Sequence, residues 1–473
     1  MNFASFKNAR VVRSSWLEEG GRRLDCNPYM SGALEARDIL RQLSVRKDPL
    51  STLTAGYVGG IYNGPMFKRN YVDSPECGVP FISSGTMMLA DLSSLPLLRR
   101  KDADSSRLSY LRLKPGMTLI SCSGTIGRTC YVRPDMDGVW SSQDVLKVVP
   151  NGSCIPSGYL YAFLCSRYGM PLVVSGTYGA IIQHIESEHI AKLPVPRFEA
   201  DAELRVHTLV ELAALKRSHA DCTLTHAITD LLCALHLPKL LLTSSPTPFS
   251  TASVQASSLQ SRFDGFFHSR YHSEAFSSIA SNGASTERLS DIASSIEEPK
   301  RFKRVPLDSD SGGIPMFGTS AIFWSDPEPL YYLPNKMAAP YVVTRKTLLI
   351  PRSGQISGVI GRPVLPYGEI IGGAVSEDAI RIHCNSEMDA GFLFVFLSSE
   401  YGIRQLKARA FGSSIPHLDV WQIGDCVIPK VPEDLWVSIG RQGLAVSELR
   451  GEAIGLEREA RRIVECAISG EEM

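Results

Sequence analysis

The chain has 473 residues, too many for one compact core and suited to two or three domains. Apolar residues make up 44% and charged residues 21%, which excludes a largely disordered chain. Lys and Arg total 49, as do Asp and Glu, so the formal net charge is zero. This balance counts against a free DNA-binding domain unless the positive charge gathers on one face or partner subunits add to it.

Cysteine usage and hydropathy restrict the compartment. The 11 cysteines lie singly, without a C-x-x-C pair, which favours buried or idle thiols in a reducing cytoplasm over a metal or disulfide framework. The first residues contain no apolar signal-peptide core. The longest apolar stretch, residues 158–174, contains Arg167 and is too short to span a bilayer. We therefore expect a soluble cytoplasmic protein.

An internal duplication runs through most of the chain. The triplet Phe67-Lys68-Arg69 recurs as Phe302-Lys303-Arg304, and GYLYAFLCSRYGM from Gly158 pairs with GFLFVFLSSEYGI from Gly391. Gly179, Ile182, His184, Ile190 and Pro196 then match Gly412, Ile415, His417, Ile423 and Pro429 without a gap. The opening triplets Arg23-Leu24-Asp25 and Arg262-Phe263-Asp264 also correspond. So many identities in one register exceed chance, so the chain contains two copies of one unit.

Each copy has the same order of parts: an opening segment, a mixed body and a long helix. Runs such as MTLISCSG, DVLKVVP, KTLLIP and DAIRIH are bounded by Gly and Pro, as strands are, and the stretches from Gly158 and Gly391 predict short buried helices. The predicted class is α+β. The expected parts are a first body (1–200), a first long helix (201–240), a linker rich in Ser, Thr and Pro (241–260), a second body (261–432) and a second long helix (433–473).

The two long helices are expected to pack as an antiparallel coiled coil. In the second helix, apolar residues step by three and four through Val446, Leu449, Ala453, Leu456, Ala460, Ile463 and Ala467. The first helix keeps this rhythm only at its end, in Leu224, Ile228, Leu231 and Leu235. Thirty helical residues extend about 45 Å, so such a pair could hold the two bodies a fixed distance apart. The alternative is that each helix covers only its own body.

The order of motifs resembles the specificity subunit of type I restriction–modification systems, over nearly the whole chain. The similar features are RLDCNPYM from Arg23, repeated as RFDGFFHSRY from Arg262, then GVPFISSGTM, GMTLISCSGTIG and the SGTYGAIIQHI stretch from Ser175. The second copy departs from the pattern, because RSGQISGVIGRP replaces SGTIGRTC and Arg409-Ala410-Phe411 replaces small residues. The second domain is therefore expected to read a different sequence or to have a differently shaped contact loop.

The resemblance implies two target-recognition domains that bind a bipartite, asymmetric target in double-stranded DNA. It also implies partners: an adenine-N6 methyltransferase subunit that uses S-adenosylmethionine and, in some systems, an ATP-driven restriction subunit. The chain itself would hold no cofactor and no metal. The runner-up function is a non-catalytic, two-domain protein-interaction scaffold in a defence complex.

Signatures of an enzyme are absent from the sequence. It contains no G-x-S-x-G, no phosphate-binding G-x-x-x-x-G-K-[ST] and no H-E-x-x-H. Asn27-Pro28-Tyr29 is interpreted as a turn, and the nuclease-like letters Asp291, Glu298 and Lys300 as chance. The duplicated His184 and His417 lie beside apolar residues, which favours a capping or core hydrogen bond over catalysis. We therefore expect no catalytic residue and a non-catalytic subunit.

Candidate DNA contacts fall into two kinds, because cations on phosphates set affinity whereas polar side chains at loop tips read base edges. The expected phosphate contacts are the duplicated pairs Lys68, Arg69, Lys303 and Arg304, together with Arg99, Arg100, Lys101, Arg345 and Lys346. The expected base readers lie in glycine-flanked loops: Ser175, Thr177, Tyr178 and Gln183 in the first copy, and Lys407, Arg409, Ser413 and Ser414 in the second. Plain surface charge and plain turns are the alternatives.

Overall fold

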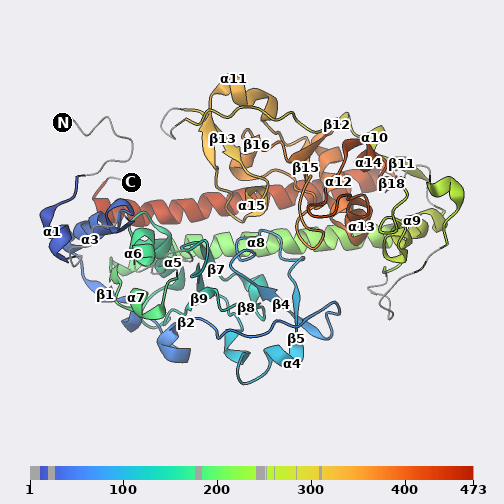
Figure 1. Cartoon of the computed structure of the whole chain (residues 1–473). Helices are drawn as coiled ribbons and strands as arrows, with labels where there is room; N and C mark the ends of the chain where they lie inside the picture. Colours follow the sequence, from blue (N-terminus) through green and yellow to red (C-terminus); the bar gives the residue numbers. More distant parts are fainter. Residues whose placement is uncertain are drawn as a thin grey trace. The chain divides into compact units, whose positions relative to one another are not determined.

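The computed structural model describes residues 11–19, 27–175, 184–240, 251, 253–259, 262–283, 285–307 and 312–471. The chain divides into two compact units, and Figure 1 labels most of their helices and strands. The first unit comprises residues 1–218 and 453–473, and the second comprises residues 219–452. Each unit therefore contains one body and a part of each long helix.

The described residues of the first unit form three small sheets. Antiparallel β1 and β10 form one pair, the second sheet has the order β2-β9-β6-β7, and the third has the order β3-β5-β4-β8, in which β4 and β8 run parallel. The strands are β1 (Lys47–Pro49), β2 (Ile61–Tyr62), β3 (Tyr71–Val72), β4 (Gly78–Ile82), β5 (Leu97–Arg99), β6 (Thr118–Ser121), β7 (Thr129–Tyr131), β8 (Trp140–Ser141), β9 (Val145–Val148) and β10 (Pro194–Pro196). The helices are α1 (Ser14–Glu19), α2 (Asn27–Met30), α3 (Ala33–Gln42), α4 (Arg100–Ala103), α5 (Ser157–Cys165), α6 (Gly169–Ser175), α7 (Ser187–Ala191) and the start of α8 (Ala200–Ala234).

The second unit repeats this plan with shorter sheets. Their orders are β11-β18, β12-β17-β15 and β14-β13-β16, with β13 and β16 parallel. The strands are β11 (Thr286–Arg288), β12 (Ser295–Glu297), β13 (Ile314–Phe317), β14 (Tyr331–Leu333), β15 (Thr347–Pro351), β16 (Ala374–Val375), β17 (Ala379–His383) and β18 (Val427–Pro429). The helices are α9 (Arg270–Ser281), α10 (Leu289–Ile292), α11 (Asn335–Ala338), α12 (Glu387–Ser398), α13 (Glu400–Ala408), α14 (Val420–Gly424) and the start of α15 (Glu433–Ser469).

The strand register confirms the duplication. In the first unit, Leu119 of β6 pairs with Lys147 of β9, and in the second unit its counterpart Leu349 of β15 pairs with Arg381 of β17. The single parallel pairing also recurs, as β4 with β8 and as β13 with β16. The predicted α+β class is therefore confirmed, with the same mixed body built twice.

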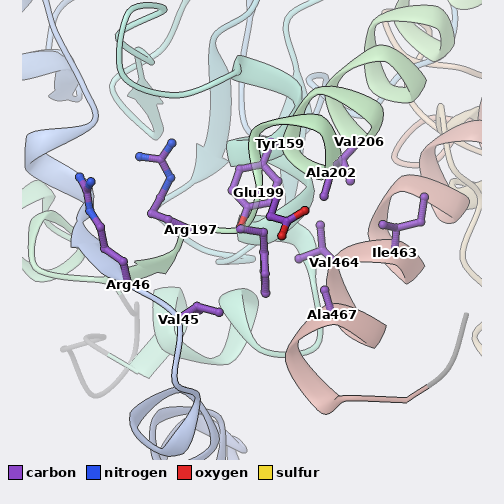
Figure 2. A pocket seen from close by; sticks show the side chains of 11 residues that line it. Val45, Arg46, Tyr159, Arg197, Glu199, Ala202, Val206, Ile463, Val464 and Ala467 are labelled. Atoms are coloured by element: carbon purple, nitrogen blue, oxygen red, sulfur yellow. The ribbon is translucent and has the colours of Figure 1, made fainter.

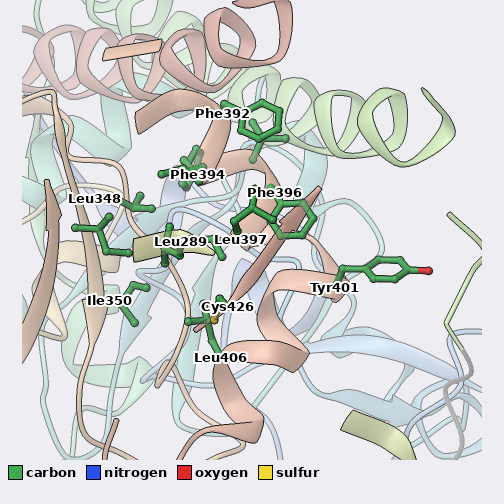
Figure 3. Close-up of a cluster of buried hydrophobic side chains, with 14 of the residues drawn as sticks. Leu289, Leu348, Ile350, Phe392, Phe394, Phe396, Leu397, Tyr401, Leu406 and Cys426 are labelled. Atoms are coloured by element: carbon green, nitrogen blue, oxygen red, sulfur yellow. The ribbon is translucent and has the colours of Figure 1, made fainter. Parts of the chain in front are cut away.

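The buried helices α5 and α12 form the centre of each body. Both are apolar on every face, as expected for a helix that is enclosed on all sides. α12 begins with a capping box, in which Ser386 Oγ accepts from the Asp389 amide at 3.1 Å and Asp389 Oδ2 accepts from the Ser386 amide at 3.0 Å. Figure 3 shows its Phe392, Phe394 and Phe396 among Leu348 and Ile350 of β15. The prediction of two short buried helices is confirmed.

A glycine lets each buried helix lie against a long helix at backbone distance. A Cβ atom at Gly391 of α12 would stand 2.1 Å from the carbonyl oxygen of Gly440 in α15. In the first unit, a Cβ at Gly158 of α5 would stand 2.9 Å from His207 of α8. Any side chain at these positions would force the helices apart. The duplicated glycine thus has a packing reason in both copies.

The two long helices are antiparallel. In the first unit, Val206 and Val210 of α8 share a core with Ala460 and Val464 near the end of α15. In the second unit, Leu224 and Leu231 near the end of α8 share a core with residues near the start of α15, Ile439 and Val446. Within each unit, the start of one helix therefore packs with the end of the other, as predicted.

The buried seam of these helices differs from the predicted seam. In α15 one buried row steps by three and four through Ile439, Gly443, Val446, Arg450, Ala453, Glu457, Ala460 and Val464, so charged Arg450 and Glu457 replace the expected Leu449 and Leu456. The expected Ile463 is buried as well. Ala467 is exposed. In α8 the regular step of three and four runs from the first turn through Glu203, Val206, Val210, Ala213, Arg217, Ala220, Leu224, Ala227 and Leu231. The sequence predicted this spacing only at the end of the first helix, because alanines and the charged residues Glu203 and Arg217 occupy many of the buried positions.

Paired charges explain why these residues are buried. In the first unit, Glu457 accepts from the Arg217 guanidinium and from the Tyr161 hydroxyl. Burial alone would raise the pKa of Glu457, but Arg217 and Tyr161 outweigh burial and lower it. In the second unit, Arg450 Nη2 donates to Asp221 Oδ1 at 3.0 Å. Each unit thus pairs its own buried arginine of the seam with a carboxylate.

Among the helices in the described ranges, none is both long and apolar enough to cross a membrane. The predicted linker and the triplet Arg23-Leu24-Asp25 lie mostly outside the residues that the structure describes.

We expect Glu457→Ala to destabilise the first unit by about 3–5 kcal/mol, because it leaves Arg217 buried without its carboxylate. Replacing both partners (Arg217→Met with Glu457→Leu) should cost much less, since no buried charge remains. Urea unfolding followed by circular dichroism measures both effects. The control is Glu459→Ala, because Glu459 is exposed and its ion pair with Arg205 is long, at 3.9 Å. Equal losses for Glu457→Ala and Glu459→Ala would contradict this account of the seam.

Candidate nucleic-acid interface

The duplicated Lys-Arg pair lies at the same place in both units, beside the start of β9 or β17, which we call the sheet edge. Its arginine is held there by a carboxylate that precedes the strand. In the first unit, Arg69 Nη2 donates to Gln143 Oε1 at 3.1 Å and to Asp144 Oδ2, directly before β9, at 3.2 Å. In the second unit, Arg304 Nη2 donates to Glu377 Oε2, just before β17, at 2.6 Å. In the duplication Glu377 is the counterpart of Gln143, and Asp144 is the counterpart of Asp378. The arginines therefore anchor this edge, while the neighbouring lysines, Lys68 and Lys303, are exposed.

A glycine-containing loop lies at the same edge. In the first unit, the loop 122–128 follows β6, and the Cys122 amide donates to the Asp144 carbonyl at 3.0 Å. In the second unit, the Arg352 amide after β15 donates to the Asp378 carbonyl at 2.8 Å. Gly124 and Gly354 have φ values of 76° and 146°, which favour glycine. Each sheet edge therefore combines an exposed lysine with a glycine loop.

The duplicated histidine joins this loop to the stretch before α7 or α14. Ser123 forms an isolated β-bridge with His184, and Ser353 forms one with His417. The Ser353 hydroxyl and His417 Nδ1 also lie 2.7 Å apart. This structural contact agrees with the interpretation of the histidine as a core hydrogen-bonding group.

The exposed hairpin 411–417 of the second unit carries two predicted base readers. Phe411 and His417 exchange backbone hydrogen bonds of 2.9 and 2.7 Å, and Gly412 has a φ of 103°. Ser413 and Ser414 are exposed at its tip, where Gln355 Nε2 donates to the Ser414 carbonyl at 3.2 Å. The structure thus brings the hairpin together with the loop after β15.

Two other predicted readers of the second unit have structural roles. Lys407 Nζ donates to the carbonyls of Ile356 and Gly358 at 2.6 and 3.2 Å, and burial lowers the pKa of Lys407 to about 8. Arg409 is only 5% exposed and donates to the carbonyls of Gln405, Gln422 and Asp425. We correct the expectation for Arg409, because a buried guanidinium with three carbonyl acceptors cannot reach a base edge without local unfolding.

The predicted readers of the first unit are described only in part. The Ser175 hydroxyl is at the end of α6 and donates to the Leu172 carbonyl at 2.7 Å. Thr177, Tyr178 and Gln183 lie outside the described residues.

The basic run of the first unit begins next to the Lys-Arg pair, because the Arg99 amide donates to the Asn70 carbonyl at 2.9 Å, whereas the run of the second unit lies at the other end of its strand. Arg99 forms a forked ion pair with Asp102, with distances of 2.7 and 3.0 Å, Arg100 donates to the Gly78 carbonyl at 3.0 Å, and Lys101 is exposed on α4. Arg345 and Lys346 precede β15, at the opposite end of the strand from its glycine loop. Arg345 pairs with Glu448 at 3.2 Å, and Lys346 Nζ donates to the Asn385 carbonyl at 3.2 Å. Arg345 and Lys346 therefore do not join the Lys-Arg pair of the second unit, whereas Arg99 lies beside that of the first.

The opening triplet and the nuclease-like letters also have structural partners. Arg262 is buried and donates to the carbonyls of Arg409 and Ala410 at 2.8 and 3.2 Å, while Asp264 accepts from Arg262 at 2.7 Å. Asp291 caps α10, and Glu298 pairs with Arg352 at 2.9 Å. Within the described ranges, three or more His, Cys, Asp or Glu residues nowhere gather as a metal site would require.

Each unit also contains a buried cation, in β9 or β17, that was not among the predicted residues. Lys147 and Arg381 occupy matched positions in β9 and β17. Lys147 Nζ donates to the Ser142 carbonyl at 3.1 Å, and Arg381 donates to the Val375 carbonyl at 2.7 Å. Burial lowers the pKa of Lys147 to about 7 and that of Arg381 to about 10. The signal was one basic residue inside each apolar run, DVLKVVP and DAIRIH.

A cavity of 580 Å³ in the first unit offers a different kind of site. It lies between the start of α8, with Ala202 and Val206, and the end of α15, with Ile463, Val464 and Ala467 (Figure 2). Both arginines on its rim are paired: Arg46 with Asp48 at 2.7 Å, and Arg197 with Glu203 at 2.9 Å.

The second unit has bulkier residues at the counterparts of this cavity. Leu435 replaces Ala202, and Trp436 stacks on Phe392, the counterpart of Tyr159, with ring centroids 3.7 Å apart. We therefore interpret the cavity as a packing difference between the copies.

No protein-family model matches the sequence, and no curated protein matches it. Among solved structures, the chain is similar to the S subunit of a type I restriction–modification system from M. genitalium, at 13% identity over 90% of this chain and 95% of that chain, with a TM-score of 0.32. It is also similar to a chain from a study of complex assembly and conformational transition in the type I R-M system, at 13% identity over 90% and 98%, with a TM-score of 0.29. A third is the HsdS subunit from Thermoanaerobacter tengcongensis, at 14% identity over 91% and 98%, with a TM-score of 0.28.

The buried lysine predicts a pH dependence of stability. The folded state binds the Lys147 proton more weakly than the unfolded state, so stability rises with pH between about 7 and about 10. Lys147→Met should therefore stabilise the first unit at about pH 6, and this gain should shrink at about pH 9.5. Urea unfolding at both pH values measures the gain. The control is Lys114→Met, because Lys114 is exposed. If the effect of Lys147→Met did not change with pH, the lowered pKa of Lys147 would not be the cause of the pH dependence.

Proposed function

We propose that the chain is the DNA sequence-specificity subunit of a type I restriction–modification system or of a closely similar methylation system. The observation that carries the proposal is the paired construction. Two copies of one body each place an exposed lysine, Lys68 or Lys303, beside a glycine loop at a matched sheet edge. Two such edges suit a target made of two half-sites. The motif order described above supports the same function.

In this proposal, phosphate contacts and base contacts come from different residues. Lys68 and Lys303 bind phosphates, because they are the exposed members of the duplicated pairs. Ser413 and Ser414 read base edges from the hairpin tip of the second unit, and the loop 122–128 serves the first unit. Because the loop 122–128 and its counterpart 352–358 differ in sequence, the two half-sites differ, and the complete target is asymmetric.

The chemistry belongs to partner subunits. The chain binds DNA in the cytoplasm and directs an adenine-N6 methyltransferase subunit, which holds S-adenosylmethionine, to the target. In a system that also restricts, an ATP-dependent nuclease subunit joins the complex. The chain contributes no catalytic residue to either reaction.

One observation favours the alternative of a protein-interaction scaffold. The formal net charge is zero, and Arg69, Arg99, Arg304 and Arg345 are all engaged in ion pairs. A scaffold would show no salt-dependent binding to DNA, whereas a DNA reader must release counterions from each phosphate that it contacts.

We expect the full chain to bind duplex DNA with an affinity that falls steeply as salt is added. Lys68→Ala and Lys303→Ala should each weaken binding and reduce the slope of log affinity against log salt by about 1. Fluorescence anisotropy with a labelled duplex, repeated over a salt series, measures both quantities. Lys336→Ala is the control, because this exposed lysine lies on α11, outside the candidate edge. Salt-independent binding, or no binding, would favour the scaffold.

A further inference from the structure

The first unit contains one strained turn that the proposed contacts leave unexplained. Val58 has φ 47° and ψ 45°, the left-handed conformation that a β-branched residue rarely adopts. Its side chain is 70% exposed, so burial of the side chain does not compensate for the strain. Strained residues of this kind persist where the surrounding structure determines them, and they gather at functional sites.

Backbone contacts hold this turn closed. Thr54 Oγ1 donates to the Gly59 carbonyl at 2.7 Å, and the Val149 amide donates to the Gly60 carbonyl at 2.7 Å. A Cβ at Gly60 would stand 2.6 Å from the Ala55 carbonyl oxygen. The turn is thus tied to the end of β9, and it presents Val58 and its neighbour Tyr57 to the outside.

Tyr57 belongs to a platform of three tyrosines. Its ring stacks on Tyr110 with centroids 4.0 Å apart and planes at 15°, and the edge of Tyr62 meets Tyr57 at 5.1 Å and Tyr110 at 5.8 Å. Tyr62 Oη donates to the Tyr110 carbonyl at 3.2 Å. Tyr57 is 49% exposed. A rigid pair of stacked rings therefore has an aromatic surface open to a further ring.

The cation Arg107 acts on Tyr110 of this platform, and Lys68 is close to it along the chain. Arg107, three residues before Tyr110, is exposed and donates from Nη2 to the Met66 carbonyl at 3.0 Å. Exposed Lys68 follows Met66 by two residues, at the sheet edge described above. An aromatic surface beside cations fits a nucleic-acid base with its phosphates better than it fits an apolar protein surface.

The second unit lacks this arrangement at the matched positions. In the first unit Tyr62 pairs with Lys147 in the sheet. In the second unit the residue that pairs with the matched Arg381 is Glu297, so a glutamate stands where the first unit has Tyr62. The connection before β2 covers residues 50–60, whereas the connection before β12 covers only 289–294. The platform is therefore a property of the first copy alone.

We propose that the platform of Tyr57, Tyr110 and Tyr62, with Val58 at its tip, stacks on a base and opens one base step in the half-site that the first unit reads. This inference rests on the proposed function. An apolar side chain inserted between base pairs partially unstacks them, and a neighbouring aromatic ring can replace the lost stacking. The platform thereby adds selectivity, because base steps differ in the cost of unstacking.

The test uses the full chain and a duplex that carries the target selected by the wild-type chain. A set of duplexes carries 2-aminopurine at one position each within the first half-site, and its fluorescence reports on stacking. The wild type should change the fluorescence at one step only. Tyr57→Ala should remove that change and weaken binding by roughly 5- to 100-fold. Tyr57→Phe, which keeps the ring, should behave as wild type.

Two further variants separate stacking from folding. Val58→Gly relieves the backbone strain, so it should unfold at the same or higher urea concentration while losing the fluorescence change. Tyr71→Ala removes a tyrosine that is 50% exposed on β3 but lies outside the platform, and it should leave binding and fluorescence unchanged.

The possible outcomes distinguish this inference from the proposed function. If the wild type bound its target but Tyr57→Ala bound equally well with the same fluorescence, the platform proposal would be overturned and the proposed function would stand. Equal losses for Tyr71→Ala and Tyr57→Ala would also overturn it, because the effect would not be specific to the platform. If the wild type bound no DNA, the proposed function itself would fail, and the platform proposal with it.

Discussion

The crossing of a buried helix and a long helix at backbone distance is the constraint on which each body depends. At Gly391 and Gly158, no Cβ can be accommodated without moving the long helix. The buried helix in turn supports the strands above it, as Phe394 and Phe396 do for β15. The position of each sheet edge relative to its long-helix segment therefore follows from one glycine.

Ion pairs, in addition to helix packing, fix the position of each sheet edge. The duplicated arginines, Arg69 and Arg304, each use their charge on a carboxylate that precedes a central strand. This fixes the edge from which the exposed lysines project, and it explains how a chain with no net charge can still present cations at chosen places. In the seam of the long helices, Arg217 with Glu457 and Arg450 with Asp221 have a similar internal role. In the described parts of the chain, these arginines thus stabilise the scaffold with their charge.

The repeated parts of the fold were predictable from the sequence because they depend on local pattern. Identities in register revealed the duplication, and uniform apolarity indicated the buried helices from Gly158 and Gly391. Pairings between distant residues were not predictable in this way. Arg409 looks like a loop cation in the sequence, yet it is buried because carbonyls from α13 and α14 converge on it. Likewise, Arg450 and Glu457 break the apolar pattern of the seam, and only their partners on the other helix explain their burial.

The proposed function requires that each of the two bodies reads one half of a DNA target. The most direct test replaces residues 20–200 with the first body of another specificity subunit, and then maps adenine methylation in cells that contain the partner methyltransferase. The account predicts that one half of the methylated sequence changes while the other half stays as in the wild type. If both halves changed together, or neither did, the two bodies would not be independent readers.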